Sequence, residues 1–155
     1  MKDTTVLDSL VGNASHISIV VHTHPDGDAI GSGTAMLCYL TQSRGKDAAL
    51  IVPDSIPDST FIAICKITNG SILVFDEEKE RASARINASD LIICLDCNSF
   101  SRTSGMEDAL RQSKAPKVLI DHHLNPDIEA FGLVFSETEV SSASQYDEGH
   151  SEWGY

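Results

Sequence analysis

The stretch Ile17-Ser-Ile-Val-Val-His-Thr-His-Pro-Asp-Gly-Asp-Ala-Ile-Gly-Ser32 joins a short apolar run to a helical pattern. The run Ile17–Val21 has the length and continuous hydrophobicity of a strand that is buried on both faces. The apolar face of the helix that follows is formed by Ile30, Leu37 and Leu40. The turn between strand and helix therefore carries two imidazoles and two carboxylates, at a position where α/β proteins often bind ligands.

The same arrangement occurs twice more along the chain. The apolar run Leu91–Leu95 is followed at once by Asp96, and the run Lys117–Ile120 is followed by Asp121-His122-His123. Strands that alternate with helices predict a parallel sheet, and the carboxyl ends of parallel strands meet at one edge. We therefore expect the three polar clusters to lie together.

The remaining pattern completes an α/β, Rossmann-like doubly wound fold, with a mainly parallel sheet of about five strands and helices on both faces. Further strands are expected at 48–52, 72–75 and 131–135. Further helices are expected at 3–14, within 54–70, at 76–85 and at 106–113, and another helix opens near 139–143.

Composition favours one folded domain. The chain has 155 residues, of which 41% are hydrophobic, and it contains no run of the roughly 18 apolar residues that a membrane span requires. No signal-type apolar block follows the first residues, so a cytoplasmic location and no membrane partner are expected. The net charge of −12 argues against binding of long duplex nucleic acid, which depends on clustered Lys and Arg.

The four cysteines do not resemble a disulfide framework, and buried thiols are the favoured interpretation. Cys94-Leu-Asp-Cys97 matches C-x-x-C, which leaves redox or metal chemistry as the alternative. A zinc site is disfavoured because no second pair accompanies it.

Carboxylates and imidazoles without thiolates suit Mn²⁺ or Mg²⁺. Two such ions roughly 3.5–4 Å apart can hold the attacking and leaving oxygens of a phosphoryl displacement, with one carboxylate bridging them. Asp96 is the best candidate for this bridge. Taken singly, each residue has a structural alternative: Asp28 as a helix cap, Asp26 in a turn, His22 in the core and Asp121 as an orienting group.

The stretch His22-x-x-Pro-Asp-Gly-Asp-Ala-Ile-Gly-Ser, the strand that ends at Asp96, and Val-Leu-Ile-Asp121-His122-His123 together resemble the first three motifs of the DHH phosphoesterases. The resemblance covers about residues 5 to 144. It is strongest to the branch of oligoribonucleases and 3′,5′-phosphoadenosine (pAp) phosphatases, also called nanoRNases. RecJ-like exonucleases, exopolyphosphatases and cyclic-dinucleotide phosphodiesterases are more distant.

The resemblance implies two Mn²⁺ ions, with Mg²⁺ as the alternative. It implies that the first ion is held by His22, Asp26 and Asp96, and the second by Asp28, Asp96 and His122. It also implies that Asp121 orients His122, and that His123 faces the scissile phosphate as a charge stabiliser or proton donor. His24 replaces the more frequent asparagine behind the ligands, and Arg102 is either a phosphate contact or a solvated loop residue.

The sequence departs from the family pattern after residue 144. We expect residues 1–144 to form a DHH domain that is incomplete at its C-terminal end, residues 145–155 to be an atypical polar tail, and the C-terminal DHHA1 substrate domain to be absent. Without the fourth motif and its carboxylate the second ion would be held more weakly, so impaired activity is one expectation. Association into a homo-oligomer, or with the missing C-terminal part, is another.

Three functions compete. The leading one is two-metal hydrolysis of phosphoester bonds in short RNA or pAp, with small phosphorylated nucleotides as partners. The alternatives are a non-catalytic fragment that binds metal or associates with another polypeptide, and a relative that acts on cyclic dinucleotides. A dinucleotide-binding Rossmann domain is weaker because Gly31-Ser-Gly33 lacks the G-x-G-x-x-G spacing.

Overall fold

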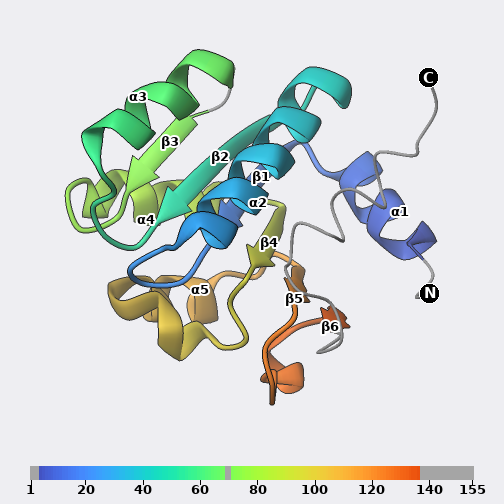
Figure 1. Ribbon diagram of the computed structural model, residues 1–155. Coiled ribbons are helices and arrows are strands. Elements are labelled where there is room, and N and C mark those ends of the chain that lie inside the picture. The colour runs from blue at the N-terminus through green and yellow to red at the C-terminus, as the bar shows by residue number, and fades with distance from the viewer. Residues whose placement is uncertain (1–3, 69–70, 137–155) are drawn as a thin grey trace.

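One parallel sheet forms the centre of the molecule in the computed structural model, which describes residues 4–68 and 71–136. The strand order is β3-β2-β1-β4-β5-β6 (Figure 1). The strands are β1 His16–Val20, β2 Asp47–Val52, β3 Ser71–Val74, β4 Leu91–Leu95, β5 Lys117–Asp121 and β6 Leu133–Ser136. The predicted doubly wound fold is confirmed, with six strands in the sheet rather than about five because β6 pairs with β5 in parallel.

Helices cover both faces of this sheet (Figure 1). They are α1 Thr5–Asn13, α2 Gly27–Cys38, α3 Asp58–Ile67, α4 Lys79–Ala88 and α5 Glu107–Gln112. Apolar residues of α1, α2 and α3 share one core layer with the sheet, and those of α4 and α5 share the other. The helix expected near 139–143 lies outside the described residues.

Burial on both faces explains why the strands read as continuous apolar runs. Along β1, Ile17 and Ile19 pack into the layer of α1 and α2, whereas Val20 packs into the layer of α4 and α5. Neighbouring residues of a strand point to opposite faces, so every position of such a strand meets a core. The one polar side chain in the middle of β1, Ser18, is buried and hydrogen-bonds Ser89 Oγ at 2.7 Å.

Helix α2 approaches β2 closely at one glycine. A Cβ atom on Gly33 would lie 2.9 Å from Leu50 Cδ1, whereas a Cβ atom on Gly31 would meet nothing within 4 Å. The close approach fixes α2 against the sheet and so fixes the residues at its N-terminus. Of the two glycines in this helical turn, only Gly33 is required by packing.

The cysteines differ in their surroundings. Cys94 and Cys97 are buried, and burial raises the pKa of both thiols, that of Cys97 to about 11. Both side chains therefore remain protonated at neutral pH, as expected of inert core thiols. Cys65 on α3 is exposed, so the expectation of burial is wrong for this residue because it lies on the solvent side of an amphipathic helix.

The direction of the sheet order reverses between β1 and β4, because β2 and β3 lie on one side of β1 and β4 to β6 on the other. In open α/β sheets, ligands bind at the carboxyl ends of the strands beside such a reversal. The loops after β1, β4 and β5 all emerge at this edge. In the described part of the chain, no helix has the length and apolar character needed to cross a membrane.

Candidate metal centre

His22 follows β1 and is 5% exposed. Its Nδ1 lies 2.7 Å from the carbonyl oxygen of Thr23, which is an acceptor only, so Nδ1 carries the hydrogen and Nε2 a lone pair. That Nε2 atom is buried and has no hydrogen-bond partner among the described residues. It lies 3.4 Å from Asp96 Oδ2 and 3.9 Å from Asp26 Oδ1. A buried lone pair that faces two carboxylates is a place for a cation.

Asp26 begins the next element as the N-cap of α2. Its Oδ1 accepts hydrogen bonds from the backbone N–H groups of Asp28 and Ala29, at 3.1 and 3.0 Å. The sequence alternative that Asp28 caps this helix is wrong, because the helix begins at Gly27 and Asp28 lies in its first turn. Both carboxylates are favoured there by the partial positive charge of the helix N-terminus.

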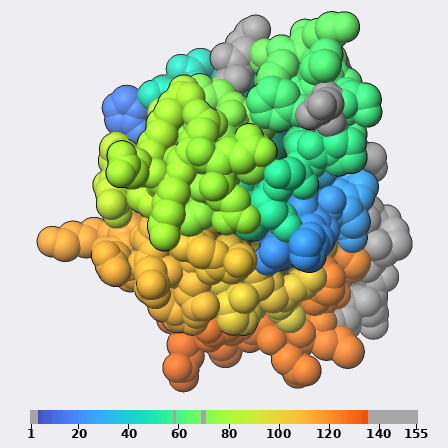
Figure 2. Space-filling view, turned by 90° about the vertical axis from the view of Figure 1, so that its left-hand side faces the viewer, coloured from blue at the N-terminus to red at the C-terminus, as the bar shows by residue number. Residues whose placement is uncertain are grey.

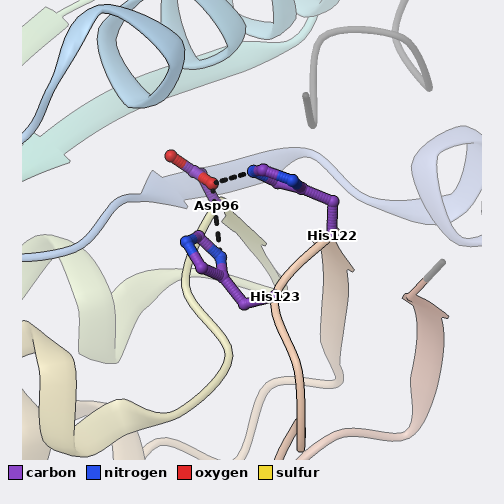
Figure 3. Close-up of side chains that lie close together, drawn as sticks. All are labelled: Asp96, His122 and His123. Carbon is purple, nitrogen blue, oxygen red and sulfur yellow. Dashed lines mark hydrogen bonds and ion pairs between the residues drawn. The ribbon is translucent and has the colours of Figure 1, made fainter. Parts of the chain in front are cut away.

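Asp96 is the residue at which the loops converge. It directly follows β4, is 1% exposed and has a φ of 53°. Its Oδ1 lies 3.1 Å from His122 Nε2 and 3.4 Å from His123 Nδ1, and Figure 3 shows both rings turned toward this carboxylate. Its Oδ2 faces His22. The two oxygens of one buried carboxylate thus address imidazoles from two different loops.

Asp28 and His122 complete the cluster from two other elements. Asp28 Oδ2 on α2 lies 3.4 Å from His122 Nε2, which follows β5. The described residues form two groups whose potential ligand atoms all lie within 4.8 Å of one another. One group is His22, Asp26 and Asp96, and the other is Asp96, His122 and His123. All five predicted ligands are thus close to at least one other predicted ligand.

Asp121 lies beside His123. Its Oδ1 is 2.6 Å from His123 Nδ1, and its side chain is fully buried. The expectation that Asp121 orients His122 is therefore corrected. Beyond β5 the chain turns so that both rings face Asp96, and of the two only His123 also contacts Asp121.

Hydrogen bonds tie the three loops to one another. Thr23 after β1 donates from its backbone N–H to the carbonyl oxygen of Arg102 at 2.7 Å, and its hydroxyl donates to the same oxygen. Asn98 Nδ2 after β4 donates to the carbonyl oxygen of Leu124 after β5 at 2.9 Å. The ligands are held by this network and by the strands that precede them.

The pKa of His22 reflects its acidic surroundings. A hydrogen bond to Asp96, formed once Nε2 is protonated, raises the pKa of His22 above its usual value of 6.5. Burial and the positive charge of Arg102 oppose this effect without cancelling it. Asp96 therefore favours positive charge at Nε2, the position that a cation would take.

His24 lies outside the ligand cluster, although it stands between two ligands in sequence. Its Nδ1 is 2.8 Å from Asp54 Oδ2, and its side chain is 91% exposed. Sequence reasoning missed Asp54, because a single aspartate after a strand and a proline forms no motif. The available signal was topological: β2 neighbours β1, so the residues after both strands reach the same edge.

The donor set fits a divalent cation that prefers oxygen and imidazole nitrogen. Among the described residues, three carboxylates and two imidazoles converge without a thiolate, a set that suits Mn²⁺ or Mg²⁺. The unpaired Nε2 of His22 would gain the partner that its burial otherwise denies it.

A protein-family comparison agrees with this geometry. The family model described as "DHH family, N-terminal domain" matches residues 16–146. An exopolyphosphatase-related protein from Bacteroides fragilis is similar in structure, with 34% sequence identity and a TM-score of 0.87 over 97% of this chain. The match covers 43% of that protein, so the present chain spans less than half of its length.

Two glycosyltransferases share the fold alone. A glycosyltransferase from Streptococcus pneumoniae is 8% identical over 91% of this chain and 33% of its own, with a TM-score of 0.53. A heptosyltransferase from E. coli, solved with ADP, is 13% identical over 98% of this chain and 49% of its own, with a TM-score of 0.52.

Proposed function

Because the chain belongs to the DHH family, we propose that it carries the metal-dependent phosphoesterase centre of a hydrolase that acts on small phosphorylated nucleotides. The single observation that carries this proposal is the convergence of three loops on Asp96. Its buried carboxylate lies within 3.4 Å of imidazole nitrogens from the loops after β1 and β5. A purely structural aspartate would not need three histidines from two separate loops around it.

The ligands divide into two sets in the proposal. His22, Asp26 and Asp96 hold one Mn²⁺ ion, and Asp28, Asp96 and His122 hold the other, with Mg²⁺ as the alternative metal. His123 also lies close enough to be a ligand. Its Nδ1, however, already donates to Asp121 at 2.6 Å, which favours His122 as the ligand and His123 as the group that acts on substrate.

Bound divalent ions supply positive charge where negative charge develops on a phosphoryl group. The residues of the chain supply the rest. Asp121 holds the His123 ring by its Nδ1–H, and when the ring is protonated its Nε2–H can stabilise negative charge or give a proton to the leaving oxygen. Asp26 keeps the N-terminus of α2 fixed, and with it the position of Asp28.

Short oligoribonucleotides and pAp are the proposed substrates, and cyclic dinucleotides are the alternative. The three sequence motifs after β1, β4 and β5 support oligoribonucleotides and pAp, because they resemble those of the oligoribonuclease and pAp phosphatase branch. The similar Bacteroides protein is related to exopolyphosphatases by its description, so inorganic polyphosphate belongs in the same assay.

Metal titration followed by hydrolysis tests the proposal. The protein is titrated with Mn²⁺ and Mg²⁺ by calorimetry, and phosphate or mononucleotide release is then measured from pAp, a diribonucleotide, a cyclic dinucleotide and polyphosphate. The matched variant is Asp96→Asn, because asparagine tolerates the positive φ of this position and removes only the charge. We expect wild type to bind two ions and release product, and the variant to lose at least one ion and turnover.

The outcomes separate the competing functions. Tight binding of two ions without hydrolysis of any substrate would favour the metal-binding fragment that associates with another polypeptide. Equal turnover by wild type and Asp96→Asn would remove the catalytic claim, and absence of ion binding would contradict both functions.

A further inference from the structure

A second histidine–carboxylate pair lies next to the metal centre and has no part in it. Asp54 follows β2, and its carboxylate is 17% exposed. It accepts the backbone N–H of His24 at 2.8 Å through Oδ1, and it lies 2.8 Å from His24 Nδ1 through Oδ2. The carboxylate therefore holds both the backbone and the ring of His24.

With these two contacts to Asp54, the imidazole of His24 is exposed to solvent. His24 has a φ of 50°, a left-handed conformation that costs a residue with a Cβ atom about 1 kcal/mol or more. The side chain is 91% exposed, and among the described residues its one ion pair is made through Nδ1 and not through Nε2. The ring, held through Nδ1 and exposed to solvent, can be reached by a ligand from outside the described chain.

The hydrogen bond to Asp54 determines what Nε2 can do. An ionised carboxylate only accepts hydrogen bonds, so Nδ1 carries the hydrogen in this contact. The Nε2 atom of the neutral ring then has a lone pair and acts as an acceptor. Phosphate oxygens are acceptors too and do not match it, whereas a hydroxyl group can donate to it.

The backbone position of His24 places the residue beside the proposed ligands. His24 is two residues from His22 and two from Asp26, so its Cα atom lies within about 7 Å of theirs. Figure 2 shows the blue surface of the segment at the start of α2 next to the blue-green surface of the segment after β2. His24 thus lies in the loop that carries His22 and Asp26, next to the segment after β2 that carries Asp54.

We propose that His24, held by Asp54, accepts a hydrogen bond from a ribose hydroxyl of the substrate and thereby favours ribonucleotides over deoxyribonucleotides at this centre. The inference rests on the proposed function, since it requires a nucleotide phosphate at the metal ions. A ribose hydroxyl is the donor that lies closest to the phosphoester of such a substrate. His24 acts here as a specificity-determining residue and Asp54 as the residue that positions it.

Equilibrium binding tests the inference without turnover. With Mg²⁺ present, calorimetry measures the affinity for AMP, 2′-deoxy-AMP and 3′-deoxy-AMP, and the two deoxy probes identify which hydroxyl is read. One net hydrogen bond corresponds to roughly a 3- to 10-fold preference for AMP over one deoxy analogue. We expect wild type to show this preference and His24→Gly to lose it. Glycine suits this test because it adopts the positive φ without strain.

Two further variants separate reading of the sugar from structural effects. Asp54→Ala removes the contact with the ring and the contact with the backbone N–H of His24, so its AMP to deoxy-AMP ratio is expected to fall toward one. His16→Ala is the matched control, because His16 forms a similar exposed pair with Asp47, also at 2.8 Å, at the amino end of β1. Its ratio is expected to equal that of wild type.

Each result has a distinct meaning. AMP binding without sugar preference, or a preference that persists in His24→Gly, overturns the inference and leaves the proposed function intact. A wild-type protein that binds no ion, or binds ions but none of the three nucleotides, contradicts the proposed nucleotide function, and the inference falls with it.

Discussion

The Oδ1 atom of Asp121 lies 2.6 Å from Nδ1 of His123, at the carboxyl end of β5. This contact fixes the tautomer of His123 and the direction of its ring. We predict that Asp121→Asn lowers kcat roughly 10²- to 10⁴-fold, the usual contribution of a well-positioned acid or base. Steady-state kinetics on the best substrate of the wild-type protein would measure the loss.

Metal binding provides the control for this variant. Because Asp121 contacts His123 and not the proposed ligands, calorimetry should show Asp121→Asn binding the same number of ions as wild type. Loss of an ion together with activity would show that Asp121 supports the ligands instead. An unchanged kcat would contradict the proposed role of His123.

The metal affinity should depend on pH through His22. Protonation of Nε2 is favoured by Asp96, which raises the pKa of His22 above 6.5, and the metal requires the same lone pair. We therefore expect the apparent affinity to weaken as pH falls through this raised pKa, approaching about 10-fold per pH unit below it. Calorimetry from pH 6 to 8.5, in buffers with different ionisation enthalpies, would also detect the displaced proton.

In the metal-free protein, protonation of His22 should affect the stability of the fold. Since the folded-state pKa of His22 is raised, its protonation stabilises the fold fully below the unfolded value of about 6.5, and this contribution disappears as pH rises through the folded value. NMR titration of the imidazole without metal should give a midpoint above 6.5. A midpoint below this value would contradict the prediction, whereas His16→Ala should leave the His22 midpoint unchanged.

Two glycines of α2 should respond differently to the same substitution. Gly31→Ala meets nothing within 4 Å and should raise the free energy of unfolding by up to about 1 kcal/mol, through the better helix propensity of alanine. Gly33→Ala gains the same term but places Cβ 2.9 Å from buried Leu50 Cδ1. Overpacking typically costs about 1–3 kcal/mol, so this variant should be the less stable one.

Urea denaturation of both variants measures the difference directly, because the propensity term is shared and cancels. Equal stability of Gly31→Ala and Gly33→Ala would show that Leu50 can move aside at little cost. The result matters for the metal centre, since the approach at Gly33 holds the helix that carries Asp28.

The sheet was predictable because its strands are buried on both faces and therefore read as continuous apolar runs between turn residues. The ends of those runs also predicted that His22, Asp96 and His122 would converge, since parallel strands bring their carboxyl ends to one edge. Whether the run at 131–135 joins the sheet as a sixth strand was harder to predict, because β6 has only four residues.

Individual contacts were less predictable than the cluster. The partner of Asp121 depends on the local turn of the chain after β5, which places His123 and not His122 beside it. Asp54 could not be found from spacing, because its partner His24 lies 30 positions earlier and the pair forms only through the adjacency of β1 and β2. Such contacts depend on tertiary arrangement, which a one-dimensional pattern does not encode.

The positive φ of Asp96 restricts what evolution can place at this position. A left-handed backbone is readily adopted by glycine and tolerated by asparagine and aspartate, while most other side chains are disfavoured there. Among those three, only aspartate offers a carboxylate. Glutamate also offers a carboxylate, but its side chain is disfavoured at a positive φ. Two independent demands thus leave one amino acid of the twenty, so a complete substitution scan of this codon should return aspartate alone.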